Sequence, residues 1–296
     1  MRAAPRTAYA GALVLVLVLV ALVVVRTRDA DAPEGRSPAP APAASGSTDP
    51  ESRVVCGDPD QVAADLAALE ERTGARVGVH VVVPATGETL GYRDDERFAF
   101  ASTIKALAAA AVLEEAGPGD LDRRVREALD AAVTLSDNAA GNLLLDVLGG
   151  PAALDERLED AGDDVTRVER REPDLNDYTP GDDRDTTTPA ALAGTLAAYA
   201  LGPRLPRADR ALLNDLLERN TTGDALVRAV VPDDWTVGDK TGTASYGTRN
   251  DVAVVRPPGR PPLVLAVMTR HGEPDAAADD ALVADAARVV VRAVCR

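Results

Sequence analysis

The sequence predicts an α+β fold, in which both ends of the chain form an antiparallel sheet of five strands and an all-helical part is inserted between them. Five strand-like runs lie near the two ends of the folded part: residues 77–83, 88–92, 235–242, 251–256 and 262–269. The residues between them, 102 to about 218, are rich in helix formers. Strands at both ends of a helical middle are expected to pair in one sheet flanked by helices.

The remaining elements follow from local signals along the chain. Residues 59–72 are predicted to form a helix because their apolar side chains recur with a helical period. The turn at 84–87, Pro-Ala-Thr-Gly, joins the first two strands as a hairpin. Turns at 246–247 and 257–259 separate the last three strands, and residues 276–294 are expected to close the chain as a helix.

The chain begins with a predicted targeting segment, residues 1–28, which is either a signal peptide or a retained membrane anchor. Arg2 and Arg6 precede an uncharged apolar run at 10–25. Residues 29–53 are rich in Pro and Ala, which predicts a disordered linker. We therefore expect an exported protein that is secreted or associated with the cell envelope, with possible membrane association through the N-terminal segment.

The folded domain is predicted to span residues 54–296. Its parts are bounded as follows: the sheet part at about 54–94 and 219–296, and the helical part at about 95–218. Cys56 and Cys295 lie at the two ends of this domain. In an exported chain, two cysteines that bracket a domain are more often paired than free. This predicts a disulfide, and the alternative is two unconnected thiols.

The composition argues against several kinds of site. The chain has 32 Lys and Arg against 48 Asp and Glu, and its formal net charge of −16 would repel the phosphates of nucleic acid. The two histidines, His80 and His271, and the two cysteines stand in no spacing typical of a zinc site. We expect no nucleic-acid partner, no metal and no cofactor. The base of a hydrolase would then be a lysine or a carboxylate.

Ser102 is the candidate nucleophile. It stands in the run Ala-Ser-Thr-Ile-Lys at 101–105, and helix formers without Gly or Pro follow at 106–115. This places Ser102 in the first turn of a helix with Lys105 on the same face, so that hydroxyl and amine can meet. A lysine with a lowered pKa can take the proton of a serine. The alternative is an ordinary helix start.

Three further stretches carry polar groups that suit catalysis. Residues 136–138, Ser-Asp-Asn, supply a second hydroxyl and an amide after an apolar helical run. Residues 240–243, Lys-Thr-Gly-Thr, lie on a predicted strand whose N–H groups can bind a carbonyl oxygen. Residues 172–176, Glu-Pro-Asp-Leu-Asn, lie in a polar stretch longer than an ordinary connection. The alternatives are a capped helix end, a strand that runs into a turn, and a surface loop.

Taken together and in this order, the four stretches resemble the class A serine β-lactamases. The resemblance covers most of the chain from about Val54 to the end. It includes further matching stretches: Arg170, 184–189 (Arg-Asp-Thr-Thr-Thr-Pro), 220–223 (Asn-Thr-Thr-Gly) and 247–251 (Gly-Thr-Arg-Asn-Asp). The resemblance implies a site in a cleft between the sheet and the helical part, and hydrolysis of a β-lactam amide through an acyl-enzyme.

The resemblance also implies roles for individual residues. The implied catalytic residues are Ser102, Lys105, Ser136, Glu172 and Thr243. The implied substrate-binding residues are Asn138, Asn176, Lys240, Thr241, Gly242 and Arg249. Arg170 and Asp185 would pair to close the loop that carries the glutamate.

In this scheme Ser102 would attack the lactam carbonyl, and the N–H groups of Ser102 and Thr243 would form the oxyanion hole. Ser136 would pass a proton to the departing ring nitrogen. Glu172 would activate the water that hydrolyses the acyl-enzyme, because that water needs a base of its own. The base for acylation is either Lys105 or Glu172 acting through water.

The sequence departs from the family pattern in two places. Only 34 positions separate Ser102 from Ser136, which is fewer than usual for the family by roughly two dozen residues. The join lies near 123–127, and the shorter segment would remove one wall of the cleft entrance. In addition, Ala244 follows Thr243 where the family mostly has Gly.

The leading expectation is therefore an exported, monomeric β-lactamase that acts on penicillin- or cephalosporin-type antibiotics. One alternative is a penicillin-binding or D,D-peptidase-like acyltransferase, which shares the Ser-x-x-Lys and Lys-Thr-Gly motifs. Glu172 argues against it, because a deacylating carboxylate turns a trapped acyl-enzyme into a catalyst. The other alternative is a non-catalytic lactam-binding module, impaired by the shortened segment.

Overall fold

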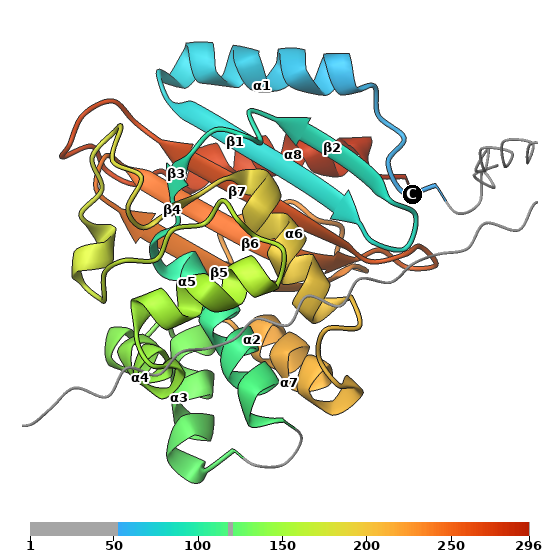
Figure 1. Ribbon diagram of the computed structural model, residues 1–296. Coiled ribbons are helices and arrows are strands. Elements are labelled where there is room, and N and C mark those ends of the chain that lie inside the picture. Colours follow the sequence, from blue (N-terminus) through green and yellow to red (C-terminus); the bar gives the residue numbers. More distant parts are fainter. Residues whose placement is uncertain (1–52, 118–120, 296) are drawn as a thin grey trace, which may run out of the picture. The chain divides into compact units, whose positions relative to one another are not determined.

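The fold is built on a five-stranded sheet with the strand order β2-β1-β7-β6-β5, in which all neighbouring strands are antiparallel (Figure 1). The strands span these residues: β1 Arg76–Val83, β2 Glu88–Tyr92, β5 Thr236–Ala244, β6 Thr248–Arg256 and β7 Leu263–Arg270. Strand β1 pairs with β7, so the first and last long strands lie side by side. The predicted α+β sheet formed by both ends of the chain is confirmed.

The computed structural model describes residues 53–117 and 121–295, which belong to one compact unit. The predicted targeting segment, 1–28, lies outside the described residues, as does the linker at 29–53 except for Arg53. These boundaries therefore stay predictions. Over the two described ranges, no helix combines the length and apolar character needed to cross a membrane.

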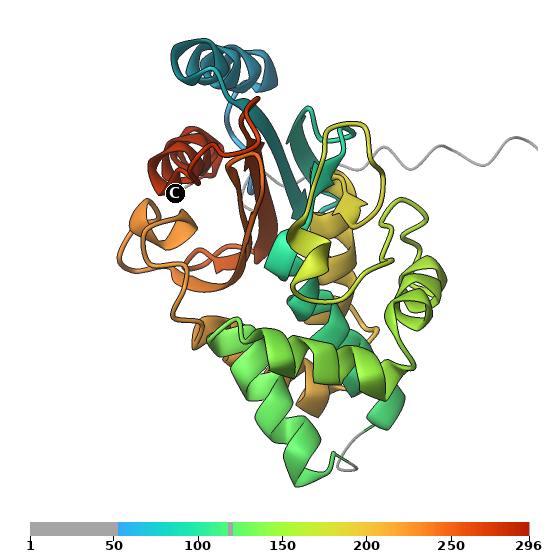
Figure 2. The ribbon, with the colours of Figure 1, turned by 90° about the vertical axis from the view of Figure 1, so that its left-hand side faces the viewer.

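Helices cover both faces of the sheet (Figure 2). Helices α1 (Pro59–Thr73) and α8 (Asp280–Ala293) lie on one face, and α6 (Pro189–Ala200) lies on the other with the rest of the helical part. Side chains alternate along each strand, so Val252 of β6 joins the core on the α6 side and Ala253 joins the core under α8.

The helical part surrounds α2, which spans Ile104–Ala116. All ten residues from Ile104 to Leu113 are buried, and six of these are small Ala or Val side chains that let neighbouring helices approach closely. The other helices of this part are α3 Arg123–Thr134, α4 Asn138–Leu148, α5 Pro151–Asp160 and α7 Arg207–Glu218. Asp122 and Asp137 cap α3 and α4 by accepting a hydrogen bond from a backbone N–H of the first turn.

Some predicted boundaries were wrong. Residues 276–279 are not helical, because Asp279 caps α8 and accepts from the N–H of Leu282. Strand β6 begins at Thr248 rather than 251, since residues 248–250 already pair with β5. Ser102 lies in a short 3₁₀ turn, η2 (Ala101–Thr103), which leads into α2. The other short elements are β3 Phe98–Ala99, η3 Asp174–Asn176, β4 Thr186–Thr187 and η4 Val227–Ala229.

A disulfide joins the two ends of the domain. Cys56 and Cys295 are bonded, with 5.2 Å between their Cα atoms and 239 positions between them in the chain. A β-bridge between Val55 and Val294 lies beside the bond. The predicted disulfide is thus present, and it ties the start of the domain to the residues that follow α8.

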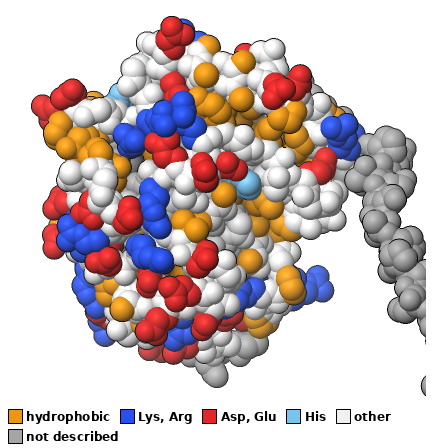
Figure 3. All heavy atoms as spheres, turned by 45° about the horizontal axis from the view of Figure 1, so that its top comes forward, with side chains coloured by type: hydrophobic (Ala, Val, Ile, Leu, Met, Phe, Trp, Pro, Cys, Tyr) orange, Lys and Arg blue, Asp and Glu red, His pale blue; other side chains and the backbone are white. Residues whose placement is uncertain are grey.

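The surface carries many Arg–carboxylate pairs, and acidic and basic side chains are mixed over the face in Figure 3. Arg76 contacts Glu96 at 2.6 Å, and Arg93 contacts Glu70 at 3.0 Å. Partly exposed pairs of this kind contribute little to stability because water competes for both partners.

Candidate active site

Ser102 is positioned by the η2 turn and by the edge strand β5. Ala101, directly before it, has a positive φ of 51°, which turns the chain sharply into α2. Strand β5 comes very close at Gly242, where a Cβ atom would lie 2.8 Å from the carbonyl oxygen of Phe100 and 3.2 Å from the amide nitrogen of Ser102. The glycine of the Lys-Thr-Gly motif therefore allows β5 to pack against the turn that carries Ser102.

Lys105 lies at the centre of a buried group of polar side chains. Its Nζ donates to Ser102 Oγ at 2.8 Å, to Asn138 Oδ1 at 2.7 Å and to the carbonyl of Ser136 at 2.9 Å. It also lies 2.8 Å from Glu172 Oε1. Burial lowers the pKa of Lys105, and the carboxylate of Glu172 opposes this effect. The amine is therefore more easily deprotonated than a surface lysine.

Glu172 is brought to Ser102 by a loop that a second helix holds in place. Its Oε1 accepts from Ser102 Oγ at 3.0 Å, and its Oε2 accepts from the amide of Asn176 at 2.5 Å. Asn142 on α4 makes two hydrogen bonds with the backbone of Glu172: it donates to the carbonyl at 2.9 Å and accepts from the N–H at 3.0 Å. The sequence reasoning missed Asn142, although it lies four positions after Asn138 on the same helix face.

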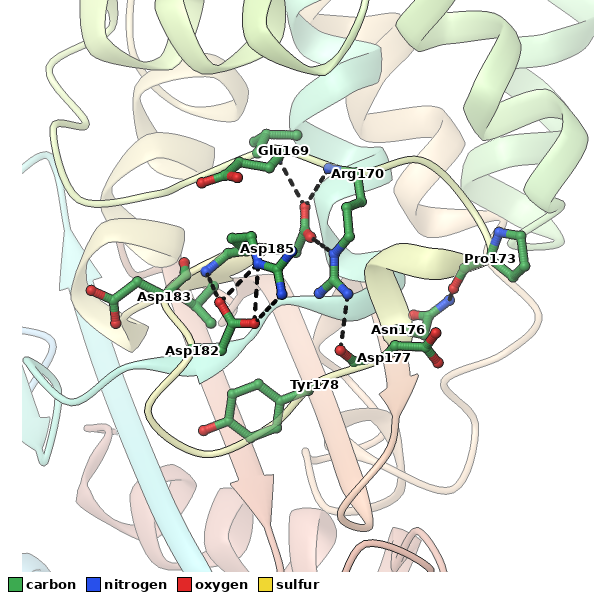
Figure 4. Close-up of polar contacts among 12 residues, drawn as sticks. Glu169, Arg170, Pro173, Asn176, Asp177, Tyr178, Asp182, Asp183 and Asp185 are labelled. Atoms are coloured by element: carbon green, nitrogen blue, oxygen red, sulfur yellow. Dashed lines mark hydrogen bonds and ion pairs between the residues drawn. The ribbon is translucent and has the colours of Figure 1, made fainter.

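The predicted pair of Arg170 and Asp185 closes the loop that carries Glu172 (Figure 4). Arg170 Nε donates to Asp185 Oδ2, and its Nη1 donates to the carbonyl of Asp177 at 3.0 Å. Asp185 Oδ1 accepts from the N–H groups of Glu169 and Arg170 at 2.9 and 3.0 Å. The buried Asp185, at the end of the loop, thus binds Glu169 and Arg170 at its start.

Ser136 lies between the two lysines. Lys240 Nζ donates to Ser136 Oγ at 2.8 Å and to the carbonyl of Thr241 at 2.8 Å. The backbone of Ser136 has a positive φ of 59°, so the chain turns here between α3 and α4. Burial, and after it the positive charge of Lys105, lower the pKa of Lys240 to about 7. The carboxylate of Asp239 opposes this shift.

Beyond Lys240, the other groups that are predicted to bind the substrate carboxylate lie together. Thr241 Oγ1 lies 2.7 Å from Thr222 Oγ1, and Arg249 Nη1 donates to Thr243 Oγ1 at 3.1 Å. Arg249 Nε also donates to Asp280 Oδ1 at 2.6 Å. No role was predicted for Thr222 or Asp280. Thr222 belongs to the matching stretch at 220–223, whereas the sequence around Asp280 carries no signal, because this residue belongs to a helix start far along the chain.

Ser245 ties the loop of Glu172 to the end of β5. Its N–H donates to the carbonyl of Asn176 at 3.1 Å. Its Oγ accepts from the N–H of Tyr178 at 2.8 Å and contacts the carbonyl of Tyr178 at 2.8 Å. Ala244, the departure from the family pattern, is the last residue of β5 and pairs with Thr248. The sequence reasoning also missed Ser245, whose partners lie 67 positions away.

The predicted residues from the four motif stretches therefore converge. The hydroxyl of Ser102 contacts an amine and a carboxylate, and the amide of Asn138 binds the same amine. The hydroxyl of Ser136 contacts Lys240, and its carbonyl contacts Lys105. Such a set can activate a nucleophile, protonate a leaving group and activate water. The two histidines take no part: His80 pairs with Asp94 at 2.7 Å, and the N–H of His271 donates to the carbonyl of Tyr246. Within the described residues, no cluster of three or more His, Cys, Asp or Glu could hold a metal ion.

Comparison with known proteins gives consistent matches. The model of a family described as "Beta-lactamase enzyme family" matches residues 61–125 and 123–294. A β-lactamase of Amycolatopsis lactamdurans is 51% identical over 257 residues, covering 79% of this chain and 85% of the relative. A β-lactamase of Bacillus licheniformis is 46% identical over 254 residues, covering 78% and 83%.

Solved structures agree with these matches. The crystal structure of a β-lactamase from Desulfarculus baarsii has a TM-score of 0.77 and 44% identity, and it covers 80% of this chain and 98% of that chain. An ancestral class A β-lactamase has a TM-score of 0.73 and 49% identity, covering 79% and 100%.

Proposed function

The chain belongs to the class A β-lactamase family and hydrolyses β-lactams, and we propose that Ser102 is the nucleophile of this reaction. The observation that carries the proposal is the contact of one hydroxyl, Ser102 Oγ, with both Lys105 Nζ at 2.8 Å and Glu172 Oε1 at 3.0 Å. A serine needs a base to become a nucleophile, and an acyl-enzyme needs a second base for its hydrolysis. Both groups are in place.

In the first step, Ser102 Oγ attacks the lactam carbonyl carbon and gives up its proton. Lys105 in its neutral form accepts this proton, since burial lowers its pKa and its Nζ is within hydrogen-bond distance. Glu172 Oε1 is equally within reach of the same hydroxyl. The N–H groups of Ser102 and Thr243 bind the oxygen that becomes negative, and such donors are among the strongest contributions to acyl transfer.

Opening of the ring requires a proton on the departing nitrogen. Ser136 supplies it, because Lys240 already donates to Ser136 Oγ and leaves the hydroxyl hydrogen free to point away. The Lys240 ammonium favours the negative charge that forms on Ser136 Oγ as the proton moves to the ring nitrogen, and it returns a proton to this oxygen. The proton that Lys105 took from Ser102 then replaces the one that Lys240 gave up, since both amines contact Ser136.

Hydrolysis of the acyl-enzyme depends on Glu172. Asn176 holds one carboxylate oxygen and Asn142 holds the backbone, so the carboxylate is fixed before a water arrives. Glu172 takes a proton from this water, whose oxygen attacks the ester carbon. The bond from this carbon to Ser102 Oγ breaks, and Glu172 returns the proton to Ser102 Oγ, which it contacts. A fixed base costs no reorganisation during the reaction.

The remaining polar groups orient the substrate. Asn138 uses its Oδ1 to accept from Lys105, which leaves its amide N–H groups to bind the carbonyl of the substrate side chain. The substrate carboxylate is bound by Lys240, the hydroxyls of Thr241 and Thr243, and Arg249. The proximity of Thr243 and Arg249, at 3.1 Å, supports their action on one anion.

Two sets of contacts support the proposal that the shortened segment before Ser136 does not disturb the catalytic groups. The carbonyl of Thr134, at the end of α3, accepts from both the N–H and the hydroxyl of Thr221 at 3.0 Å. Two positions after Thr134, Ser136 accepts hydrogen bonds from both Lys105 and Lys240. We therefore propose that the shortening affects how substrates enter and not how they react.

We further propose that the protein is exported, acts as a monomer, and is either secreted or held at the envelope through residues 1–28. The disulfide supports a location outside the cytoplasm, where such bonds persist. A site formed entirely by one chain supports a monomer. The penicillin-binding alternative is not favoured, because Glu172 is oriented for the second step.

Turnover of a chromogenic cephalosporin by the purified protein tests the proposed function. We expect steady hydrolysis, since both bases contact the reacting hydroxyl. A single burst equal to the protein concentration would instead indicate a penicillin-binding protein, and no colour change would indicate a non-catalytic module.

The low pKa of Lys240 predicts that substrate binding weakens at alkaline pH. Because Lys240 loses its proton as pH rises through about 7, KM for benzylpenicillin should rise by up to about tenfold per pH unit above that point. The value of kcat should change less, because a bound carboxylate favours the ammonium form. The Lys240→Arg variant stays charged, so its KM should be flat. A flat KM for the parent protein from pH 6 to 9 would contradict the prediction.

A further inference from the structure

Two buried aspartates lie behind the catalytic groups, on the face of the sheet opposite to the side chain of Lys240. Asp239 precedes Lys240 on β5, and Asp251 lies on β6 opposite Thr241. In this register the two aspartates are diagonal neighbours on one face, and both are fully buried. The steps proposed above do not use them.

The hydrogen bonds of the two carboxyl groups are incomplete unless they share a proton. Asp239 Oδ1 accepts from Arg228 Nε at 2.6 Å, and Asp251 Oδ2 accepts from the N–H of Val227 at 3.1 Å. Asp239 Oδ2 and Asp251 Oδ1 have no donor among the described residues. Buried oxygens without a donor are costly, and one proton between the two carboxyl groups satisfies both.

Burial and the proximity of the two carboxyl groups favour this state. Burial, and after it the negative charge of Asp239, raise the pKa of Asp251 well above its usual range. The charged groups near the pair are Arg228 on η4, Lys240 on β5 and Arg249 on β6. Arg228 contacts Asp239 at 2.5 Å and balances one negative charge. One shared proton therefore leaves a single negative charge on the pair, in direct contact with Arg228, while the charge of Arg249 opposes the rise in the pKa of Asp251.

The pair fixes the loop of residues 220–230. Val227 and Arg228 of this loop bind the two carboxyl groups. At Gly223 the loop comes so close that a Cβ atom would lie 1.6 Å from Asp239 Oδ2. No other residue type leaves room for the carboxyl group at this point.

The other side of the same loop contacts three parts of the active site. Thr221 donates twice to the carbonyl of Thr134, two positions before Ser136. The hydroxyl of Thr222 lies 2.7 Å from that of Thr241, and its carbonyl accepts from Arg249 Nη2 at 3.5 Å. Displacement of the loop would thus disturb both the turn that carries Ser136 and the groups that are proposed to bind the substrate carboxylate.

We propose that Asp251 is a positioning residue: with Asp239 it holds one proton, and this pair locks the loop 220–230 that supports Ser136 and the groups binding the substrate carboxylate. The proposal rests on the proposed roles of Ser136, Thr241 and Arg249. Asp251 touches neither substrate nor reacting atoms, so it acts through the loop alone.

The first test is the thermal stability of Asp251→Asn against the parent protein from pH 5.5 to 9. The folded parent holds a proton that the unfolded chain releases above a pKa of about 3.9. Its stability therefore falls relative to the amide variant as pH rises, until the folded pair loses its proton. We expect the difference in Tm to grow by at least roughly 4 °C over this range. A difference that does not change with pH would overturn the shared proton.

The second test separates positioning from stability by kinetics with a penicillin at pH 7. Asp251→Ala leaves the N–H of Val227 without its acceptor and Asp239 Oδ2 without the shared proton, and we expect KM to rise roughly tenfold. Asp251→Asn keeps a donor and an acceptor and should restore KM. Gly223→Ala pushes the loop away from the pair without changing any charge, and it should raise KM in the same way.

The matched control is Glu70→Ala, which removes a carboxylate that accepts from the N–H of Val77 on β1 and from the hydroxyl of Tyr92 on β2, at the edge of the sheet opposite to β5. It should lower Tm and leave KM unchanged. If Asp251→Ala does not fold, Gly223→Ala decides the kinetic question. A KM for Asp251→Ala or Gly223→Ala equal to that of the control would overturn the positioning role. Absence of hydrolysis in the parent would contradict the proposed function, whereas the stability test would still decide on the proton.

Discussion

The Glu172→Ala variant is expected to react with benzylpenicillin and to remain trapped as the acyl-enzyme. Lys105 Nζ still contacts Ser102 Oγ at 2.8 Å, so the first proton transfer retains a base. The second step loses the carboxylate that activates water, and the loss of such a base slows a reaction by roughly 10²–10⁴-fold. Mass spectrometry of the intact protein within minutes of mixing should show the added mass of one penicillin. Release of product as fast as in the parent protein would show that another group is the base for deacylation.

Two control variants accompany this experiment. Ser102→Ala removes the nucleophile, so it should show no added mass at any time. Glu169→Ala removes an exposed carboxylate from the same loop, and it should turn over penicillin like the parent. If Glu172→Ala also fails to be labelled while Glu169→Ala is labelled and turns over, Glu172 rather than Lys105 is the base for acylation.

Loss of the disulfide is expected to have the largest effect on stability. Replacing both Cys56 and Cys295 by alanine opens a loop whose ends are 239 positions apart in the chain. In the chain-entropy description, a loop of this length stabilises the folded state by about 3–5 kcal/mol. For a domain of this size the variant should therefore melt roughly 10 °C lower. The measurement is unfolding by heat and by urea.

The activity of the folded double variant should match that of the parent protein. The cysteines lie at the ends of the domain, and the β-bridge between Val55 and Val294 remains to hold them together. Titration of thiols in the unfolded parent protein without reductant should find none. Two free thiols would show that the bond does not form in solution.

Local patterns predicted most of the fold. The alternation along residues 77–83 and the helical period of residues 59–72 correspond to β1 and α1 within one or two positions. Such periods depend only on neighbouring residues, so they can be read from the chain. The errors lie at element ends, as at Asp279 and Thr248, where a cap or a pairing with another strand determines the boundary.

The proposed catalytic residues could be named because they lie in short motifs that carry the family resemblance, whereas their supports could not. Ser102 and Lys105 are three positions apart on one turn of the chain. Asn142 and Ser245 act on backbone groups 30 and 67 positions away, and neither stands in a motif. A side chain that binds a distant backbone group needs only an amide or hydroxyl, which occur everywhere in a sequence.

The sequence by itself determined the fold class and the disulfide, and its motifs, through the family resemblance, indicated the residues proposed for the chemistry, because periodicity and side-chain type are local properties. Only the tertiary structure decided which groups share one proton or one anion. Lys240 reaches Ser136 across 104 positions of the chain. Asp239 and Asp251 meet only because β5 and β6 pair in one register. Burial at these meeting points then shifts the pKa of Lys240 and Asp251 in opposite directions, since a dry environment disfavours whichever form carries charge.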